Sequence, residues 1–251
     1  MADSATSIAL WLRKYHEARQ GAPQLVVFPH AGGSASFYTP LSRALSPQLD
    51  VYAVQYPGRQ DRRNEPFIPT MRDLADTIAP ILTDFSTGPL TLYGHSLGAI
   101  LAFEVAVRLS PNVSIAHLFA SGARPPAAHR RGTLHLQSDA AVLAEVREMS
   151  GTQASLLDDK EVQQMVLPAL RNDYQISETY EYTQHDALPC AITTFSGSED
   201  PKIDAHSMSD WARHTTDQHS EHTFPGGHFF ITEHWARVAS IIRQQSIKNQ
   251  R

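Results

Sequence analysis

The chain alternates between short apolar runs and longer segments in which apolar residues recur every three or four positions. The short runs predict strands at about 25–28, 51–56, 90–93, 116–121, 191–196 and 220–224. The longer segments predict helices at about 34–45, 71–85, 99–109, 209–214 and 231–245. Strands that alternate with helices along a chain are typical of a mostly parallel sheet with helices on both faces. We therefore predict an α/β fold.

The alternation breaks between Gly122 and Pro189, where no run is strand-like. Helical patterns fill about 139–149, 159–170 and 173–182. So long a helical segment between two strands of one sheet is more than a simple crossover needs. We expect a single domain over residues 1–251 in which about 122–189 form a lid over the carboxyl edge of the sheet. Most apolar lid residues are expected to pack on the core, and the candidates for lining a pocket are Leu143, Val146, Met149, Leu156, Leu157, Met165, Leu167 and Leu170.

A G-x-S-x-G sequence at residues 94–98 joins the strand-like run ending at Tyr93 to the helical pattern that starts at Ala99. A strand that reverses sharply into a helix leaves no room for side chains beside the central residue, and the two glycines provide that room. The turn lifts the hydroxyl of Ser96 above the sheet and directs it toward the helix N-terminus. This context predicts a nucleophile elbow with Ser96 as the nucleophile.

A serine hydroxyl needs a general base, and the base needs an acid that orients it. In serine hydrolases with this elbow, the acid and then the histidine follow the serine along the chain. His228 comes after two glycines near the C-terminus, in a loop that can place its imidazole over the edge of the sheet. Asp200 follows the strand-like run 191–196, where open α/β sheets collect functional groups. We predict His228 as the base and Asp200 as the acid, with Glu199 as the alternative acid.

The reaction also needs two backbone N–H groups that stabilise a developing oxyanion. One donor is expected from Leu97, the residue after the nucleophile, and the other from the loop that follows an early strand. The loop after the strand at 25–28 contains Gly32 and Gly33, which allow the backbone to approach a substrate closely. Ala31 is the predicted second donor, and its neighbour His30 stays an alternative.

These motifs resemble the type II thioesterases that serve nonribosomal peptide and polyketide synthases. The resemblance runs from about residue 22 to 245 and rests on residues 28–33, 55–62, 93–99, 167–174, 197–201 and 226–229. The Tyr-Pro-Gly-Arg stretch at 56–59 and the Leu-Pro-x-Leu-Arg stretch at 167–171 are more selective for this family than the elbow. The resemblance implies an α/β-hydrolase fold and matches Ser96, Asp200 and His228 to the family's catalytic triad.

The resemblance also implies a substrate and a partner. The family hydrolyses acyl groups from the phosphopantetheine arm of an acyl or peptidyl carrier protein, either to edit or to release them. Carrier proteins are usually acidic, so a basic surface near the entrance would favour docking. The candidates in predicted loops are Arg59, Arg62, Arg63, Arg124, Arg130 and Arg131.

Composition narrows the remaining function classes. The 251 residues carry 21 basic and 26 acidic side chains, for a formal charge of −5, which argues against nucleic acid as a partner. No run of about 18 apolar residues could span a membrane, and the N-terminus lacks the pattern of a signal peptide. We therefore expect a cytoplasmic enzyme. No Cys/His cluster has the spacing of metal ligands, so we expect neither metal nor cofactor.

Three other functions stay open at this point. A carboxylesterase or lipase shares the triad and differs in its pocket. An acyltransferase or cyclase of the same fold transfers the acyl group to an amine or hydroxyl in place of water. A noncatalytic binding module built on a hydrolase fold is the third, and the intact serine, acid and histidine argue against it.

Overall fold

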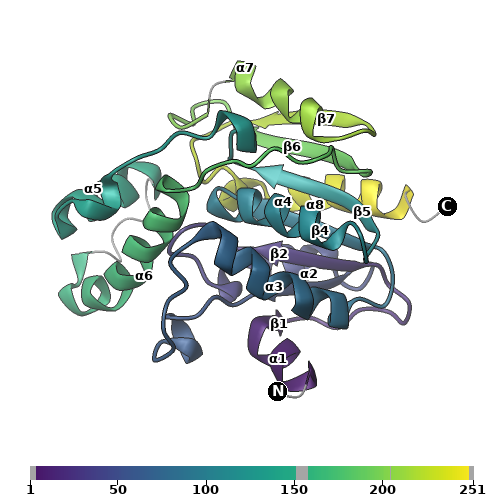
Figure 1. The fold of residues 1–251 in the computed structure, drawn as a ribbon, viewed down its shortest axis with the longest axis horizontal. Helices are drawn as coiled ribbons and strands as arrows, with labels where there is room; N and C mark the ends of the chain where they lie inside the picture. Colours follow the sequence, from purple (N-terminus) through teal and green to yellow (C-terminus); the bar gives the residue numbers. More distant parts are fainter. Residues whose placement is uncertain (1–3, 151–157, 204, 249–251) are drawn as a thin grey trace.

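A seven-stranded sheet forms the centre of the computed structural model, which describes residues 4–150, 158–203 and 205–248 (Figure 1). Its strands are β1 (Leu12–Lys14), β2 (Gln24–Phe28), β3 (Asp50–Val54), β4 (Leu90–His95), β5 (Ile115–Ser121), β6 (Ala191–Gly197) and β7 (His219–Phe224). They lie in the order β1-β3-β2-β4-β5-β6-β7, and only the β1–β3 pair is antiparallel within this part of the chain. The predicted α/β fold and its six strands are confirmed, whereas β1 was not predicted.

Helices cover both faces of this sheet, as predicted (Figure 1). One face carries α1 (Ser4–Trp11), α3 (Met71–Phe85) and α4 (Leu97–Leu109), and the other carries α2 (Thr39–Leu45) and α8 (Ile231–Lys248). Alternate residues of β2 serve the two faces: Val26 and Phe28 pack with α3 and α4, while Leu25 and Val27 pack with α2 and α8. Because a strand points successive side chains to opposite faces, a strand covered on both faces is apolar throughout.

Two helices, α5 (Asp139–Ser150) and α6 (Lys160–Glu178), occupy the segment between β5 and β6 in its described part. The prediction of two separate helices at 159–170 and 173–182 is wrong, because α6 is one helix that continues through residues 171–172 and ends at Glu178. Its buried residues recur at helical spacing across that point: Ala169, Leu170, Asp173 and Ile176. Asp159 caps the start of α6 by accepting a hydrogen bond from the Glu161 N–H at 2.8 Å.

Several short elements complete the described fold. They are the 3₁₀ turns η1 (Ala35–Tyr38), η2 (Gln60–Arg62), η3 (Pro126–Ala128), η4 (Leu134–Leu136) and η6 (Ser209–His214), and the short helix α7 (Ala205–Met208). The predicted helix over 34–45 is thus divided into η1 and α2, and the one over 209–214 is a 3₁₀ turn. Helix α1 has no counterpart among the predicted elements.

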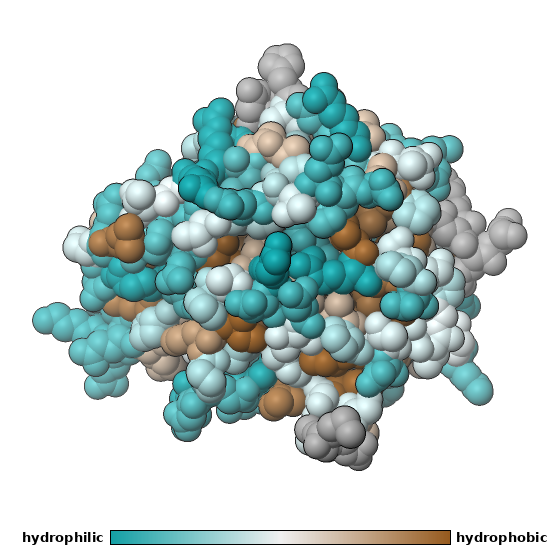
Figure 2. All heavy atoms as spheres, in the orientation of Figure 1, coloured by the Kyte–Doolittle hydropathy of each residue, from teal (hydrophilic) through white to brown (hydrophobic). Residues whose placement is uncertain are grey.

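The parallel strands place their carboxyl ends at one edge of the sheet. The loops that leave this edge follow β2, β4, β6 and β7, and they contain residues 29–33, 96, 198–203 and 225–230. Figure 1 shows α5 and α6 together at one side of the molecule, away from the helices that flank the sheet. In the face shown in Figure 2, hydrophobic groups are scattered among hydrophilic side chains. Within the described ranges, no helix is both long and apolar enough to cross a membrane.

Candidate active site

Ser96 occupies a strained turn between β4 and α4. Its φ of 55° and ψ of −122° lie in a region that costs a non-glycine residue about 1–3 kcal/mol. The surroundings enforce the turn: a Cβ at Gly94 would overlap the carbonyl of Gly98, and a Cβ at Gly98 would overlap the carbonyl of Phe28. The Ser96 N–H donates to the Ser121 carbonyl at 2.7 Å, which ties the turn to β5. The hydroxyl is therefore held at the N-terminus of α4 and faces a cavity.

Asp200 and His228 meet at the carboxyl edge of the sheet, although 28 positions separate them in the sequence. The Nδ1 of His228 lies 2.8 Å from Oδ2 of Asp200. The second carboxylate oxygen of Asp200 accepts the backbone N–H of Lys202 at 2.9 Å. Both side chains are buried. Asp200 thus orients the imidazole through Nδ1 and leaves Nε2 as the nitrogen that can act on a substrate-side group.

The loops that carry Asp200 and His228 are packed directly on each other. A Cβ at Gly197, the last residue of β6, would overlap the carbonyl oxygens of Gly226 and Gly227. The backbone N–H of Glu199 donates to the Gly226 carbonyl at 2.9 Å, and the Glu199 side chain points to solvent. The structure therefore brings Asp200, and not the alternative acid Glu199, to His228.

Two further buried histidines surround His228. The ring of His95 lies 5.2 Å from that of His228, and its Nδ1 is 2.8 Å from the hydroxyl of Ser121. Burial lowers the pKa of His95 well below its ordinary value, and the neighbouring histidines lower it further. Burial, together with His228 and Arg59, also lowers the pKa of His30 to about 3. Both side chains are therefore neutral at physiological pH. The G-x-S-x-G motif by itself indicates no role for His95, its second residue.

The loop after β2 lies beside the nucleophile turn because Phe28 pairs with Gly94 across β2 and β4. The Gly33 N–H donates to the His30 carbonyl at 2.9 Å, and the Gly32 N–H donates to a carboxylate oxygen of Asp173 at 2.7 Å. The Ala31 N–H, in contrast, has no hydrogen-bond acceptor within the described residues. Leu97 begins α4, and the first N–H groups of a helix lack helical acceptors.

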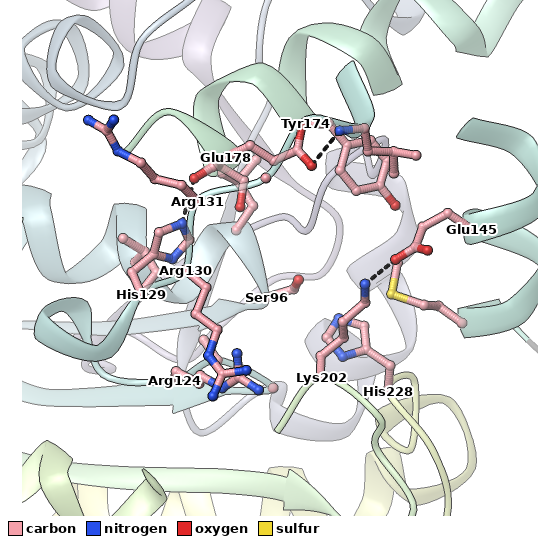
Figure 3. Close-up of a pocket in the computed structure, with 18 of the residues that line it drawn as sticks. Ser96, Arg124, His129, Arg130, Arg131, Glu145, Tyr174, Glu178, Lys202 and His228 are labelled. Atoms are coloured by element: carbon pink, nitrogen blue, oxygen red, sulfur yellow. Dashed lines mark hydrogen bonds and ion pairs between the residues drawn. The ribbon is translucent and has the colours of Figure 1, made fainter. Parts of the chain in front are cut away.

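A cavity of about 590 Å³ opens in front of Ser96, Leu97 and His228 (Figure 3). Much of its lining is polar or charged: Arg124, His129, Arg130, Arg131, Thr133, Gln137, Glu145, Tyr174, Ser177, Glu178 and Lys202. The lining also includes Ile100, Ala123, Leu134, Met149 and Ile203. The volume is in the range of small-molecule sites. Residues from α5 and α6 close one side of this cavity, and residues after β4, β5, β6 and β7 close the other.

The eight apolar residues predicted as candidates for lining a pocket lie in different places in the structure. Among the eight, Met149 lines the cavity in the described part of the chain. Leu143 and Leu170 are buried in packing contacts, whereas Met165 is 68% exposed. Val146 and Leu167 are half-buried and lie outside the cavity lining. Leu156 and Leu157 lie outside the described residues.

Several basic side chains line the cavity. Figure 3 shows Arg124, Arg130 and Lys202 on the side of Ser96 opposite Glu178. Lys202 forms an ion pair with Glu145, which joins the loop after β6 to α5.

Two of the arginines proposed for a docking surface are inside the protein, and that expectation is wrong for them. Arg59 is 8% exposed and pairs with Asp173, and Arg62 is 3% exposed and pairs with Glu65. The two Nη atoms of Arg59 bond Asp173 and the Gly33 carbonyl, and Arg62 bonds Glu65 and the Gln55 carbonyl, so both buried guanidinium groups are held inside the fold and away from a surface partner. Arg63 and Arg131 are exposed, and Arg131 pairs with Glu181.

Comparisons with known proteins show the family to which the chain belongs. A family model described as a thioesterase domain matches residues 23–246. The "Probable cadicidin biosynthesis thioesterase" of Streptomyces griseus is 44% identical over 237 residues, which cover 94% of this chain and 66% of that relative. Thioesterase PikA5 of Streptomyces venezuelae is 39% identical over 236 residues, covering 93% of this chain and 84% of the relative.

A solved structure is similar over nearly the whole chain. The structure of the type II thioesterase BorB from the borrelidin biosynthetic cluster superimposes with a TM-score of 0.90 and 42% identity, covering 94% of this chain and 98% of BorB. The seven-stranded sheet, the elbow and the cavity described above thus occur in a chain that matches thioesterases in both sequence and structure. The chain belongs to the thioesterase domain family and is a type II thioesterase of the kind found in polyketide and nonribosomal peptide biosynthesis, an enzyme that hydrolyses thioesters.

Proposed function

We propose that this enzyme removes acyl groups from the phosphopantetheine arm of an acyl or peptidyl carrier protein, with Ser96, His228 and Asp200 as its catalytic triad. The observation that carries the proposal is the cavity lined by both the strained Ser96 and His228, whose imidazole is hydrogen-bonded to the buried Asp200. A nucleophile, a base and an oriented acid at one cavity are the parts that acyl transfer through an acyl-serine requires.

The mechanism follows from these positions. His228 takes the proton of Ser96 at Nε2 as the hydroxyl oxygen attacks the thioester carbonyl. The N–H groups of Leu97 and Ala31 stabilise the oxyanion, and the thiol leaves with the proton from His228. Water, activated by the same histidine, then releases the acid from the acyl-serine. Asp200 keeps the proton of the neutral imidazole on Nδ1 and stabilises the imidazolium.

The carrier partner is proposed from charge and from the family. Arg124, Arg130 and Lys202 line the cavity that contains Ser96, and basic side chains there favour encounter with an acidic carrier protein. We further propose that residues of about 122–189 act as a lid, since α5 and α6 form one wall of the cavity. A cytoplasmic location fits this proposal, because synthases and their carriers work there.

One experiment separates this function from the others. Purified enzyme is given an acyl group as a carrier-protein thioester, and separately as a short p-nitrophenyl ester, and the products are identified by mass spectrometry. We expect a higher kcat/KM on the carrier thioester and free acid as the product. Preference for the free ester would indicate a carboxylesterase. An ester, amide or ring product would indicate an acyltransferase or cyclase.

Two variants test the residues. Ser96→Ala should lose about 10⁶-fold in turnover and all labelling by a fluorophosphonate while keeping its fold. A Ser96→Ala protein with a tenth of wild-type activity would refute the triad, and an unlabelled wild-type protein would favour a noncatalytic module.

Arg130→Glu should raise KM for the acyl carrier at low salt but not for an acyl-pantetheine thioester. Arg43→Glu, an exposed change on α2 that is remote from the cavity, is the matched control.

A further inference from the structure

Arg59 and Asp173 form a buried, two-pronged ion pair. Nη1 of Arg59 lies 2.6 Å from Oδ2 of Asp173, and Nη2 lies 2.7 Å from Oδ1. Only 8% of Arg59 and 1% of Asp173 are exposed. Burial lowers the pKa of Arg59, but Asp173 and, to a smaller extent, Tyr56 together raise it by more, so the guanidinium stays charged. Buried ion pairs rarely add stability over well-packed apolar side chains. The contribution of Arg59–Asp173 to the free energy of folding therefore does not by itself account for the pair.

The remaining hydrogen bonds of the pair go to the loop after β2. Oδ2 of Asp173 accepts the Gly32 N–H at 2.7 Å, and Nη1 of Arg59 donates to the Gly33 carbonyl at 3.0 Å. Neither Arg59 nor Asp173 lines the cavity as described. The ion pair therefore holds the backbone immediately after Ala31 without touching the place where a substrate would bind.

This backbone forms a turn that sets the direction of the Ala31 N–H. The Gly33 N–H closes the turn on the His30 carbonyl at 2.9 Å. That carbonyl and the Ala31 N–H belong to one trans peptide group, so they point in opposite directions. Gly32 has a φ of 72°, a conformation that suits glycine at the third position of such a turn. Whatever fixes Gly32 and Gly33 therefore also aims the Ala31 N–H.

Two further contacts hold the loop that contains this turn. A Cβ at Gly32 would overlap Leu170, so α6 lies directly against the turn. The hydroxyl of Tyr56 donates to the Pro29 carbonyl at 3.1 Å. Of the two stretches most selective for the family, 56–59 supplies Tyr56 and Arg59 and 167–171 supplies Leu170, so both contact the loop after β2.

We propose that Arg59 and Asp173 are positioning residues that hold the turn His30–Gly33 so that the Ala31 N–H faces the oxyanion. The inference rests on the proposed function, because it needs Ser96 as nucleophile and Ala31 as donor. Donors that are fixed before the reaction stabilise the transition state most, since no reorganisation is needed when charge develops. The pair also joins α6 to the loop after β2, so the orientation of the donor depends on α6 being seated.

The first test replaces one partner. In Asp173→Asn, one N–H of the amide faces the guanidinium, and the buried charge of Arg59 loses its counterion. Deleting an oxyanion donor costs about 10²–10³ in kcat, so a misdirected donor should cost roughly 10- to 100-fold. KM for an acyl-pantetheine thioester should change little. The Ki of a trifluoromethyl ketone analogue of that thioester, whose serine adduct places an oxyanion at the site, should rise in parallel with the loss of kcat.

A matched control and a double variant separate positioning from folding. Glu104→Gln changes a buried carboxylate of α4 that accepts the Tyr180 hydroxyl at 2.6 Å, beyond the end of α6 and away from the turn. It should leave kcat within about twofold, because the amide oxygen of glutamine can still accept the Tyr180 hydroxyl and no partner of the oxyanion loop is removed. Arg59→Met with Asp173→Leu replaces the pair by apolar side chains and should recover the thermal midpoint. It should not recover kcat, because Gly32 and Gly33 still lack their partners.

The outcomes are distinct. A folded double variant with wild-type kcat would overturn the inference and leave the pair with a structural role alone. A loss of kcat in Asp173→Asn that matches the unfolded fraction, with an unchanged Ki for the ketone, would overturn it as well. If Ser96→Ala keeps its activity, the proposed function fails first. Loss of kcat in a stable double variant, with Ser96→Ala inactive and Glu104→Gln active, would support the inference.

Discussion

Replacing Asp200 by asparagine removes one hydrogen-bond acceptor from a site that uses two. Oδ2 accepts from His228 Nδ1 at 2.8 Å, and Oδ1 accepts the Lys202 N–H at 2.9 Å. An amide has one oxygen and one NH₂ group, so one of these two donors must then face another donor. The Lys202 N–H is part of the backbone and cannot change. The imidazole can change by moving its proton from Nδ1 to Nε2.

We therefore expect the amide oxygen to stay with Lys202 and the NH₂ group to donate to Nδ1 of His228. In that tautomer Nε2 carries the proton and cannot accept one from Ser96. The corresponding change in a well-studied serine protease costs about 10⁴ in kcat. A loss of that size corresponds to about 5.4 kcal/mol of transition-state stabilisation.

The assay is kcat on an acyl-pantetheine thioester, with thermal unfolding as a check that the variant is folded. Glu199→Gln is the matched control, because Glu199 is adjacent in sequence but exposed, and only its backbone N–H contacts the histidine loop. It should keep kcat within about twofold, since its side chain has no part in the tautomer choice. Asp200 does not set the tautomer of His228 if Asp200→Asn keeps a tenth of wild-type kcat, or if Glu199→Gln is the more damaging change.

Two further predictions concern stability and specificity. Burial, partly offset by Asp217, lowers the pKa of His117 to about 4, so its neutral form is favoured in the folded state. The unfolded chain takes up this proton below about pH 6.5, so wild-type stability should fall between pH 6.5 and 4 by about 1.4 kcal/mol per pH unit from this residue alone. His117→Gln should reduce the stability lost between pH 7 and 5 by about 2 kcal/mol in urea unfolding, and an unchanged loss would contradict the burial argument. Met149→Ala should shift the preference among acyl chain lengths, since a methylene in an apolar pocket is worth about 1–3 kcal/mol. Lys160→Ala, an exposed change at the start of α6, should leave that preference unchanged. Equal chain-length profiles for both variants would show that Met149 does not shape the acyl site.

Strands β2 and β4 could be predicted because they are buried on both faces and are therefore mostly apolar. Strand β1 has three residues, two of them Arg13 and Lys14, and it pairs only at the sheet edge. No apolar pattern marks so short an edge strand. The length of α6 was missed for another reason. Its buried side includes the charged Asp173, which interrupts the apolar pattern that a sequence reader follows.

The residues of the candidate site also include some whose place could be predicted from the sequence and some whose place could not. Ser96, Asp200 and His228 each follow a strand-like run, so their common place at the sheet edge could be predicted, while their roles stay predictions. Arg59 was assigned to the surface because arginine in a loop is normally solvated. Its partner is 114 positions away on a helix whose course was not predicted. A buried ion pair between distant segments leaves no mark in the local pattern of either one.

The same contacts indicate which part of the proposed lid can open. The second half of α6 is tied to the core by the Arg59–Asp173 pair, and Tyr180 just beyond it bonds Glu104 of α4. Separating a buried pair costs about 3–5 kcal/mol, because it leaves an uncompensated charge. Helix α5 is joined to its surroundings by partly exposed ion pairs, among them Lys202–Glu145, which are worth about 0–1 kcal/mol each. It also packs through the buried side chains of Val142 and Leu143, but separating apolar side chains leaves no unpaired charge. Entry of an acyl arm is therefore expected to move α5 while α6 keeps the oxyanion loop in place, so that the site can open without losing the alignment of its donor.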